Sequence, residues 1–221
     1  MVFRSCLKRI PLLNDKEYGM FHFINRQKVP EVRIRMEKTM CVGVIEFQSV
    51  GKGMLAQDEM MKTASVSVLF GRTICSGKYL IAICGGVDDV QTAVDTGVRI
   101  GGDAVIDFLV CPKVHPSVFA ALGQSVILPS TRVPALGIVE SFGACSILAA
   151  SDFAAKAGNV TLIRLHLAMA LGGKGLLMLV GPLSDVKTST KAAADEVRRR
   201  GLLVSEAIIS NPAEELLMEY I

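Results

Sequence analysis

The sequence predicts an α+β protein of two tandem domains, each with the ferredoxin-like order β-α-β-β-α-β. Two observations favour this fold class: the chain repeats itself once, and each copy carries the same order of hydrophobic patterns. The motif Gly43-Val44-Ile45-Glu46 returns as Gly137-Ile138-Val139-Glu140, 94 positions later. A repeat this long indicates tandem domains, which we place at residues 41–130 and 131–221.

The apolar pattern assigns the elements of each copy in turn. Short apolar runs predict strands at 42–48 and 136–141, followed by helices at 52–65 and 146–158. Two strands, 66–74 and 79–84, then flank the turn Cys75-Ser76-Gly77. Apolar residues three or four positions apart predict a second helix in each copy: Val87, Val90, Val94, Val98 and Gly101, then Leu183, Val186, Thr190, Ala194 and Val197. Strands at 105–111 and 201–209 close the two domains.

The alignment of the two copies is not uniform. From Lys78, which matches Lys174, the offset becomes 96, and Pro116 is then expected to match Pro212. The two extra residues fall in the turn after the third element, where Cys75-Ser76-Gly77-Lys78 faces the longer segment 169–174. The copies therefore differ most at this turn.

Composition favours an oligomer. Hydrophobic residues make up 51% of the 221-residue chain and charged residues 20%, with a mean hydropathy of +0.45. With so few charged residues, much of the surface must be apolar, and this apolar surface is expected to be covered by copies of the same chain. The most apolar window, 162–183, contains Arg164, His166 and Lys174, so we expect no membrane span. Without a recognisable signal peptide, we expect the protein in the cytoplasm.

The positive charge lies at the start of the chain. Residues 1–35 hold eight Lys or Arg against three Asp or Glu, whereas the whole chain has a net charge of +3. The body is therefore slightly acidic, and we expect no nucleic acid as a partner. Residues 1–40 are expected to be a basic, poorly ordered extension or a wrongly assigned start, with Met36 or Met40 as the natural beginning.

Nothing in the sequence indicates an enzyme. The six cysteines form no CxxC pair, which excludes a zinc ribbon or a ferredoxin-type run within one chain. No GxSxG or P-loop motif is present. The three histidines are expected to be structural, because His115 precedes Pro116 at a turn, His166 lies in a predicted strand and His22 lies in the basic leader.

Three segments resemble the bacterial microcompartment (BMC) shell domain: 43–47, 58–66 and 85–90. Segment 155–160 of the second copy is similar to the same family's helix-to-strand junction. Two such domains in one chain resemble the tandem-domain class, which implies a pseudohexameric homotrimer in a microcompartment shell. The implied partners are further copies of the chain, other BMC shell proteins and redox enzymes inside the compartment.

Two turn segments make the resemblance more specific, because they are similar to one subgroup of the family. Segments 73–78 and 166–174 are similar to a propanediol-utilisation subgroup of tandem shell proteins, which carries an iron-sulfur cluster in the central pore. The resemblance implies that the pore is lined by Ser76, Gly77, Ala170, Leu171 and Gly172. It also implies one 4Fe-4S cluster per trimer held by three Cys75 thiolates, because the counterpart of Cys75 is Met169. A thiol lining an empty pore remains the alternative.

Lys62 and Lys156 are equivalent in the repeat and end the first helix of each copy. By default such lysines are solvated surface residues. The resemblance implies that they lie at the edge of the tile and contact the next tile.

The expected function is a structural shell protein whose pore cluster serves electron transfer across the shell or cluster delivery. An alternative is a shell protein whose empty pore is a metabolite channel. A more remote alternative is a small-molecule sensor built from two ferredoxin-like domains.

Overall fold

The computed structural model describes residues 41–123, 126, 128, 132–168 and 171–218. These residues belong to one compact unit. The predicted basic extension at 1–40 and the predicted pore residue Ala170 lie outside the described residues.

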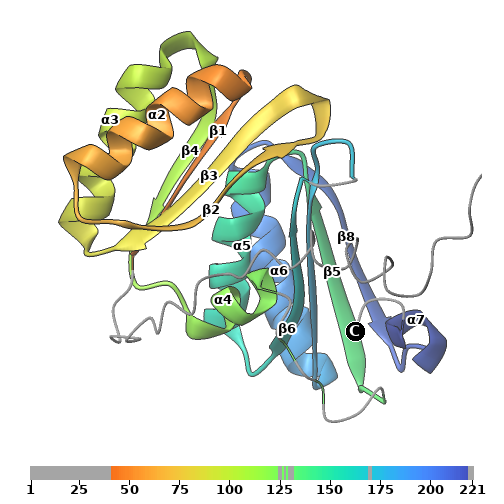
Figure 1. The fold of residues 1–221 in the computed structure, drawn as a ribbon. Coiled ribbons are helices and arrows are strands. Elements are labelled where there is room, and N and C mark those ends of the chain that lie inside the picture. Colours follow the sequence, from red (N-terminus) through yellow and green to blue (C-terminus); the bar gives the residue numbers. More distant parts are fainter. Residues whose placement is uncertain (1–40, 124–125, 127, 129–131, 169–170, 219–221) are drawn as a thin grey trace, which may run out of the picture. The chain divides into compact units, whose positions relative to one another are not determined.

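The first copy folds as the sequence predicts, with ends shifted by one or two residues. Its elements are β1 (Cys41–Phe47), α2 (Val50–Thr63), β2 (Ser67–Ile74), β3 (Lys78–Gly85), α3 (Val87–Gly101) and β4 (Val105–Cys111). The sheet is antiparallel with strand order β2-β3-β1-β4, and α2 and α3 lie on one of its faces (Figure 1). The short helix α4 (Pro116–Leu122), which the sequence did not indicate, follows.

The second copy repeats this order. Its elements are β5 (Ala135–Ser141), α5 (Ala144–Ala157), β6 (Thr161–Leu167), β7 (Gly175–Gly181), α6 (Leu183–Arg199), β8 (Leu203–Ser210) and the short helix α7 (Glu214–Met218). The strand order β6-β7-β5-β8 is the same as in the first sheet. The prediction of two α+β copies is therefore confirmed, and the sheets of both copies are antiparallel.

The central strand β1 is buried on both faces. All seven of its residues are buried, which explains why its sequence is apolar except at Glu46. Ile45 and Phe47 belong to the core under α2 and α3, whereas Val42 and Val44 belong to a second core that includes residues of α5. The first sheet is thus covered on one face by its own helices and on the other by the second domain.

A glycine in each central strand allows a helix to approach closely. A methyl group added at Gly43 would lie 2.6 Å from Cγ2 of Val94, and one at Gly137 would lie 2.1 Å from Oγ1 of Thr190. Both distances are shorter than a normal contact, so the second helix of each copy would have to move away. The glycine of the repeated motif is therefore needed for helix-to-sheet packing.

The sheet register corrects one detail of the repeat. Val42 pairs with Cys111 in the first sheet, and its equivalent Leu136 pairs with Ile209 in the second. Cys111 and Ile209 are therefore equivalent at an offset of 98, and the expected match of Pro116 with Pro212 is wrong by two residues. The reason is a longer helix, since α6 has 17 residues and α3 has 15. Positive φ angles of 54° at Lys113 and 46° at Asn211 support the corrected offset.

Helix α5 joins the two domains. Four contacts connect α5 to the first domain, and we call this region the domain junction. At the start of α5, Ala144 N lies 3.4 Å from Glu46 Oε2, and Cys145 Sγ lies 3.9 Å from Val44 O. Further along the helix, Asp152 Oδ1 accepts the His115 amide at 2.8 Å, and Asp152 Oδ2 lies 3.7 Å from Cys111 Sγ. Ten residues of α5 are consequently buried, compared with three in the equivalent helix α2.

Among the described residues, no helix is both long enough and apolar enough to cross a membrane.

Candidate functional site

The first part of the candidate site is the turn that carries Cys75. A single 3-10 turn, Cys75–Gly77, connects β2 to β3. Ser76 and Gly77 have positive φ angles of 67° and 69°, and both residues are exposed. A residue with a side chain rarely adopts this conformation, so the surrounding structure must hold Ser76 in place. Cys75 itself is partly exposed at the start of this turn.

The second part is the equivalent, longer turn between β6 and β7. Its described residues close on themselves through two backbone bonds, Ala168 N to Lys174 O and Lys174 N to Leu171 O, each 3.1 Å long. Three residues have positive φ angles: Ala168, Gly172 and Gly173. Leu171 is partly buried and Gly172 is exposed. This turn is therefore a tight backbone loop with an exposed glycine.

The two turns contact each other. The amide of Cys75 donates a hydrogen bond to the carbonyl oxygen of Ala168 at 3.3 Å. The structure thus brings together the turns that contain the predicted pore residues Ser76, Gly77, Leu171 and Gly172. The two domains contribute neighbouring parts of one site.

An ion pair follows each turn. Lys78 Nζ lies 2.8 Å from Glu46 Oε1, and the equivalent Lys174 Nζ lies 3.0 Å from Glu140 Oε2. Glu46 is 1% exposed, and its second oxygen accepts the Ala144 amide at the start of α5. In the second domain, hydrogen bonds from Ser205 and Lys174 lower the pKa of Glu140. These pairs anchor the strands that leave both turns.

Cys75 differs from the other described cysteines in its exposure. Cys41, Cys84, Cys111 and Cys145 are all buried. Burial raises the pKa of Cys41 to about 11 and that of Cys111 to about 12, and it also raises the pKa values of Cys84 and Cys145. A thiol must lose its proton to bind a metal. Cys75 is therefore the described cysteine whose surroundings best suit a metal ligand.

A single chain does not assemble a metal site from its described residues. No group of three or more His, Cys, Asp or Glu side chains gathers within them in a way that could hold a metal ion. A multinuclear cluster at Cys75 would therefore need ligands from beyond the described residues of one chain.

The two predicted edge lysines occupy equivalent positions with different surroundings. Lys62 Nζ lies 2.5 Å from Asp58 Oδ2 and 3.4 Å from Glu59 Oε1 on the exposed surface of α2. The hydrogen bond to Asp58 is the main reason that the pKa of Lys62 is raised. Lys156 Nζ lies 2.5 Å from Oδ2 of Asp152, whose side chain is only 6% exposed. Lys156 is thus anchored by the domain junction, whereas Lys62 is held only by its own helix.

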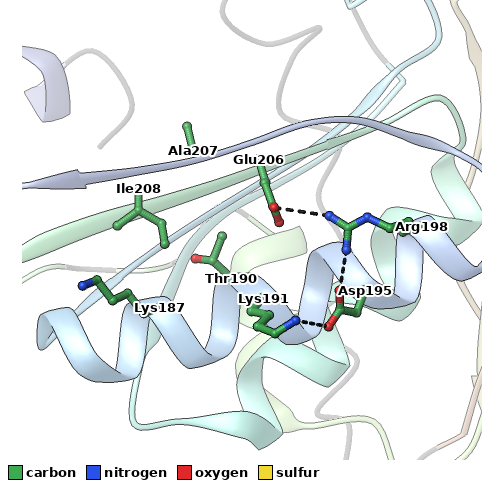
Figure 2. Close-up of a pocket in the computed structure, with 8 residues that line it drawn as sticks. All are labelled: Lys187, Thr190, Lys191, Asp195, Arg198, Glu206, Ala207 and Ile208. Atoms are coloured by element: carbon green, nitrogen blue, oxygen red, sulfur yellow. Dashed lines mark hydrogen bonds and ion pairs between the residues drawn. The ribbon is translucent and has the colours of Figure 1, made fainter.

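A separate groove of about 400 Å³ lies between α6 and β8. It is lined by Lys187, Thr190, Lys191, Asp195, Arg198, Glu206, Ala207 and Ile208. Figure 2 shows that its charged groups mostly bind one another: Arg198 pairs with Asp195 and Glu206, and Lys191 pairs with Asp195. These mutual ion pairs indicate a solvated charged surface, which is distinct from the site of the two turns.

Sequence reasoning missed two groups that organise these sites. The carbonyl of Ala168 cannot be recognised from sequence, because its role comes from a backbone conformation. The role of Asp152 at the junction was also missed, although a signal existed, since Asp152 matches Asp58 in the repeat.

Comparisons with known proteins agree with the fold. Residues 41–114 and 135–212 each match the BMC domain family. The chain is 39% identical over 178 residues to the bacterial microcompartment shell protein PduT of Citrobacter freundii, covering 80% of this chain and 96% of that one. It is 38% identical over 86 residues to the carboxysome shell protein CcmK3 of a Synechocystis strain, covering 38% of this chain and 82% of that one. A crystal structure of a microcompartment protein from Desulfitobacterium hafniense superposes with a TM-score of 0.75 at 35% identity, covering 81% of this chain and 98% of that one.

Proposed function

This chain belongs to the family of bacterial microcompartment shell proteins with tandem BMC domains, and on that basis we propose that three copies form a shell tile whose pore holds a 4Fe-4S cluster. The role of the family is structural and not enzymatic. The cluster would serve electron transfer across the shell or cluster delivery to enzymes inside. Other shell proteins of the same compartment are the proposed neighbours of the tile.

The single observation that carries the cluster proposal is the placement of Cys75. It is the one described cysteine that is not buried, and its turn is bonded to the equivalent turn of the second domain. In a ring of six equivalent domains, these turns would surround the central axis. Three chains would then present three Cys75 thiols there.

The residues fit a cubane cluster in number and kind. Thiolates are the usual ligands of iron-sulfur clusters. Three Cys75 side chains would bind three of the four irons, and the fourth iron would be left for water or another ligand. When bound, such a cluster takes up and releases single electrons. The chain's own contribution is to hold Cys75 in a turn fixed by Ala168.

The burial difference between α2 and α5 supports the trimer. Within each chain, α5 already packs in the domain junction and has ten buried residues. The equivalent helix α2 has only three buried residues, so most of its surface is exposed. A repeated head-to-tail contact forms a closed ring when its rotation allows. Three chains with two domains each would complete a ring of six.

The experiment is anaerobic purification followed by light scattering, iron and sulfide analysis, and electron spin resonance of the reduced protein. We expect three times the chain mass of 23.7 kDa and four irons per trimer. A monomer or dimer would overturn the proposed tile. A colourless, iron-free trimer would overturn the cluster.

The metabolite channel is the second candidate. Ser76, Gly77 and Gly172 are exposed and small, which favours an open passage at the turns. An iron-free trimer that still forms sheets under the electron microscope would select this function. Extended sheets of assembled tiles, whether or not the trimers contain iron, would also exclude the small-molecule sensor as the main role.

A further inference from the structure

The carboxylate of Glu46 connects three parts of the chain. One oxygen lies 2.8 Å from Nζ of Lys78, the residue that follows the turn of Cys75. The other oxygen accepts the amide of Ala144, the first residue of α5, at 3.4 Å. Glu46 itself lies in β1 and is 1% exposed, so this carboxylate is shielded from water. It therefore links the central strand, the turn and the second domain.

The turn of Cys75 is too short to be independent of these contacts. Ile74 and Lys78 are opposite one another in the pairing of β2 with β3, and only three residues lie between them. The amide of Cys75 donates to the carbonyl oxygen of Ala168 at 3.3 Å. The turn is thus fixed to the second domain at its start through Ala168 and at its end through Lys78 and Glu46.

The equivalent pair of the second domain has different surroundings. Glu140 and Lys174 repeat the ion pair at 3.0 Å, but the side chain of Glu140 is 31% exposed. Among the described residues, its other oxygen accepts the hydroxyl of Ser205 on β8 and not a helix amide. The turn beside this pair carries Met169 at the position of Cys75. Two glutamates at equivalent positions of the repeat are therefore placed differently.

The residue opposite each glutamate on the neighbouring strand differs as well. Asp107 pairs with Glu46, whereas Ser205 pairs with Glu140 and donates a hydrogen bond to it at 2.7 Å. An ionised aspartate can only accept hydrogen bonds, so it cannot replace that donor. Lys78 is thus the cation within ion-pair distance of Glu46 among the described residues. A buried carboxylate that loses its partner is strongly unfavourable, so the two side chains hold each other in place.

We propose that Glu46 is a positioning residue for the Cys75 ligand and that its ion pair with Lys78 also tunes the cluster electrostatically. This inference rests on the proposed function, because it concerns the same site. Through Lys78, Glu46 fixes the end of the turn that carries the thiol. In a trimer, three such pairs would lie next to turns with a ligand. The three Glu140 pairs would lie next to turns without one.

The two members of the ion pair should act on a cluster with opposite signs. Reduction of a cluster adds one negative charge, and fixed charges nearby make this easier or harder. Removing the negative charge of Glu46 should raise the reduction potential, and removing the positive charge of Lys78 should lower it. A loosened turn alone would not give shifts of opposite sign.

Variants of the anaerobically purified full chain test the inference. Glu46→Gln and Lys78→Met each break the ion pair with little change in side-chain size. We expect both variants to lose part of the iron per trimer, and the potential of the remaining cluster to rise in the first and fall in the second. Lys78→Arg keeps the positive charge and should restore both the iron content and the potential.

The second domain supplies the matched control. Glu140→Gln and Lys174→Met remove the equivalent ion pair, which is more exposed and lies beside a turn without a cysteine. Both variants should therefore keep the iron content and the potential of the natural chain.

A second measurement does not need iron. Hydrogen exchange of the iron-free trimer, followed by mass spectrometry of the peptide that spans the turn, reports the bond from the Cys75 amide to Ala168. Exchange there should be faster in Glu46→Gln and Lys78→Met than in the natural chain and in Glu140→Gln. Exchange in the strands of the second sheet should stay unchanged, which distinguishes a local effect on the turn from general unfolding.

The outcomes separate the inference from the proposed function. An iron-loaded trimer whose iron content, potential and exchange are unchanged by Glu46→Gln would overturn the positioning role and leave the cluster intact. Equal effects of the Glu46 and Glu140 variants would also overturn it, and potentials that move in the same direction would overturn the electrostatic tuning. An iron-free natural trimer would instead overturn the proposed cluster, and unchanged exchange at Cys75 would then overturn the positioning role as well.

Discussion

The backbone amide of His115 donates a hydrogen bond to Oδ1 of Asp152 at 2.8 Å. The other oxygen of the same carboxylate accepts Lys156 Nζ at 2.5 Å. One buried side chain thus ties the end of the first domain to α5 and also fixes the lysine at the proposed tile edge. The position of that edge therefore depends on the contact between the two domains.

Replacing Asp152 by alanine should destabilise the chain. The His115 amide would lose its acceptor, and an unsatisfied group in a largely buried place costs about 1–3 kcal/mol. Chemical denaturation by urea measures the loss. Asp58→Ala is the matched control, and it should leave the folding of one chain nearly unchanged, because Asp58 is exposed and binds Lys62 of its own helix. Equal losses in the two variants would contradict the assignment of Asp152 to the junction.

Replacing Cys75 by serine should remove the iron. The change keeps the size of the side chain but replaces the thiolate by a hydroxyl, which binds iron poorly. Because all three proposed ligands are the same residue, iron should fall to background in one step while the trimer survives. Iron content and light scattering of anaerobically purified protein test this. The control Cys84→Ser, at a buried position, should keep its iron, and an iron-loaded Cys75→Ser trimer would refute the assignment.

Replacing Lys62 by glutamate should leave the trimer intact and impair the formation of extended sheets. Lys62 is exposed at the end of α2, and its partners Asp58 and Glu59 lie on the same helix. The new carboxylate would gather three negative charges at the proposed edge. Electron microscopy of the assembled sheets is the measurement. Lys52→Glu, at the exposed start of α2, is the control, and unchanged sheets with Lys62→Glu would mean that this lysine is merely solvated.

Replacing Asp107 by asparagine should improve stability most at neutral pH. Burial raises the pKa of Asp107, and its Oδ2 has no partner among the described residues. The pKa of this carboxyl is higher in the folded chain than in the unfolded chain. Once the pH exceeds the unfolded pKa, the unfolded chain ionises more readily, and the folded state is destabilised relative to it. The variant should therefore gain relative to the natural chain as the pH rises from about 3 to about 7. Urea denaturation at several pH values tests this, and a pH-independent difference would contradict it.

The fold could be predicted from the sequence because the chain contains two copies of the same domain. Each ambiguous run could be checked against its copy, and the turn at Cys75 was located because strands flank it in both halves. The match of Pro116 with Pro212 failed because α6 is two residues longer than α3, and no motif marks the end of either helix in the sequence. The strand pairing of Ile209 with Leu136 reveals that shift, and the positive φ angles at Lys113 and Asn211 agree with it.

The candidate site was harder to predict because its surroundings come from distant segments. Asp58 and Asp152 have the same sequence context, each four residues before a lysine, yet one is bare and the other is buried. That difference depends on which surface the helix meets. Likewise, the bond from Cys75 to Ala168 joins residues far apart in the chain through backbone atoms, and backbone roles leave little trace in a single sequence.

The duplication also has a genetic consequence at the two bonded turns. In a ring of six separate single-domain chains, any change in the turn would appear six times, because one gene encodes every copy. Joining two domains in one gene lets the first turn keep Cys75 while the second carries Met169. Selection can then act on alternate positions around a ring, so a threefold chemical pattern can arise on a sixfold framework by ordinary point mutation.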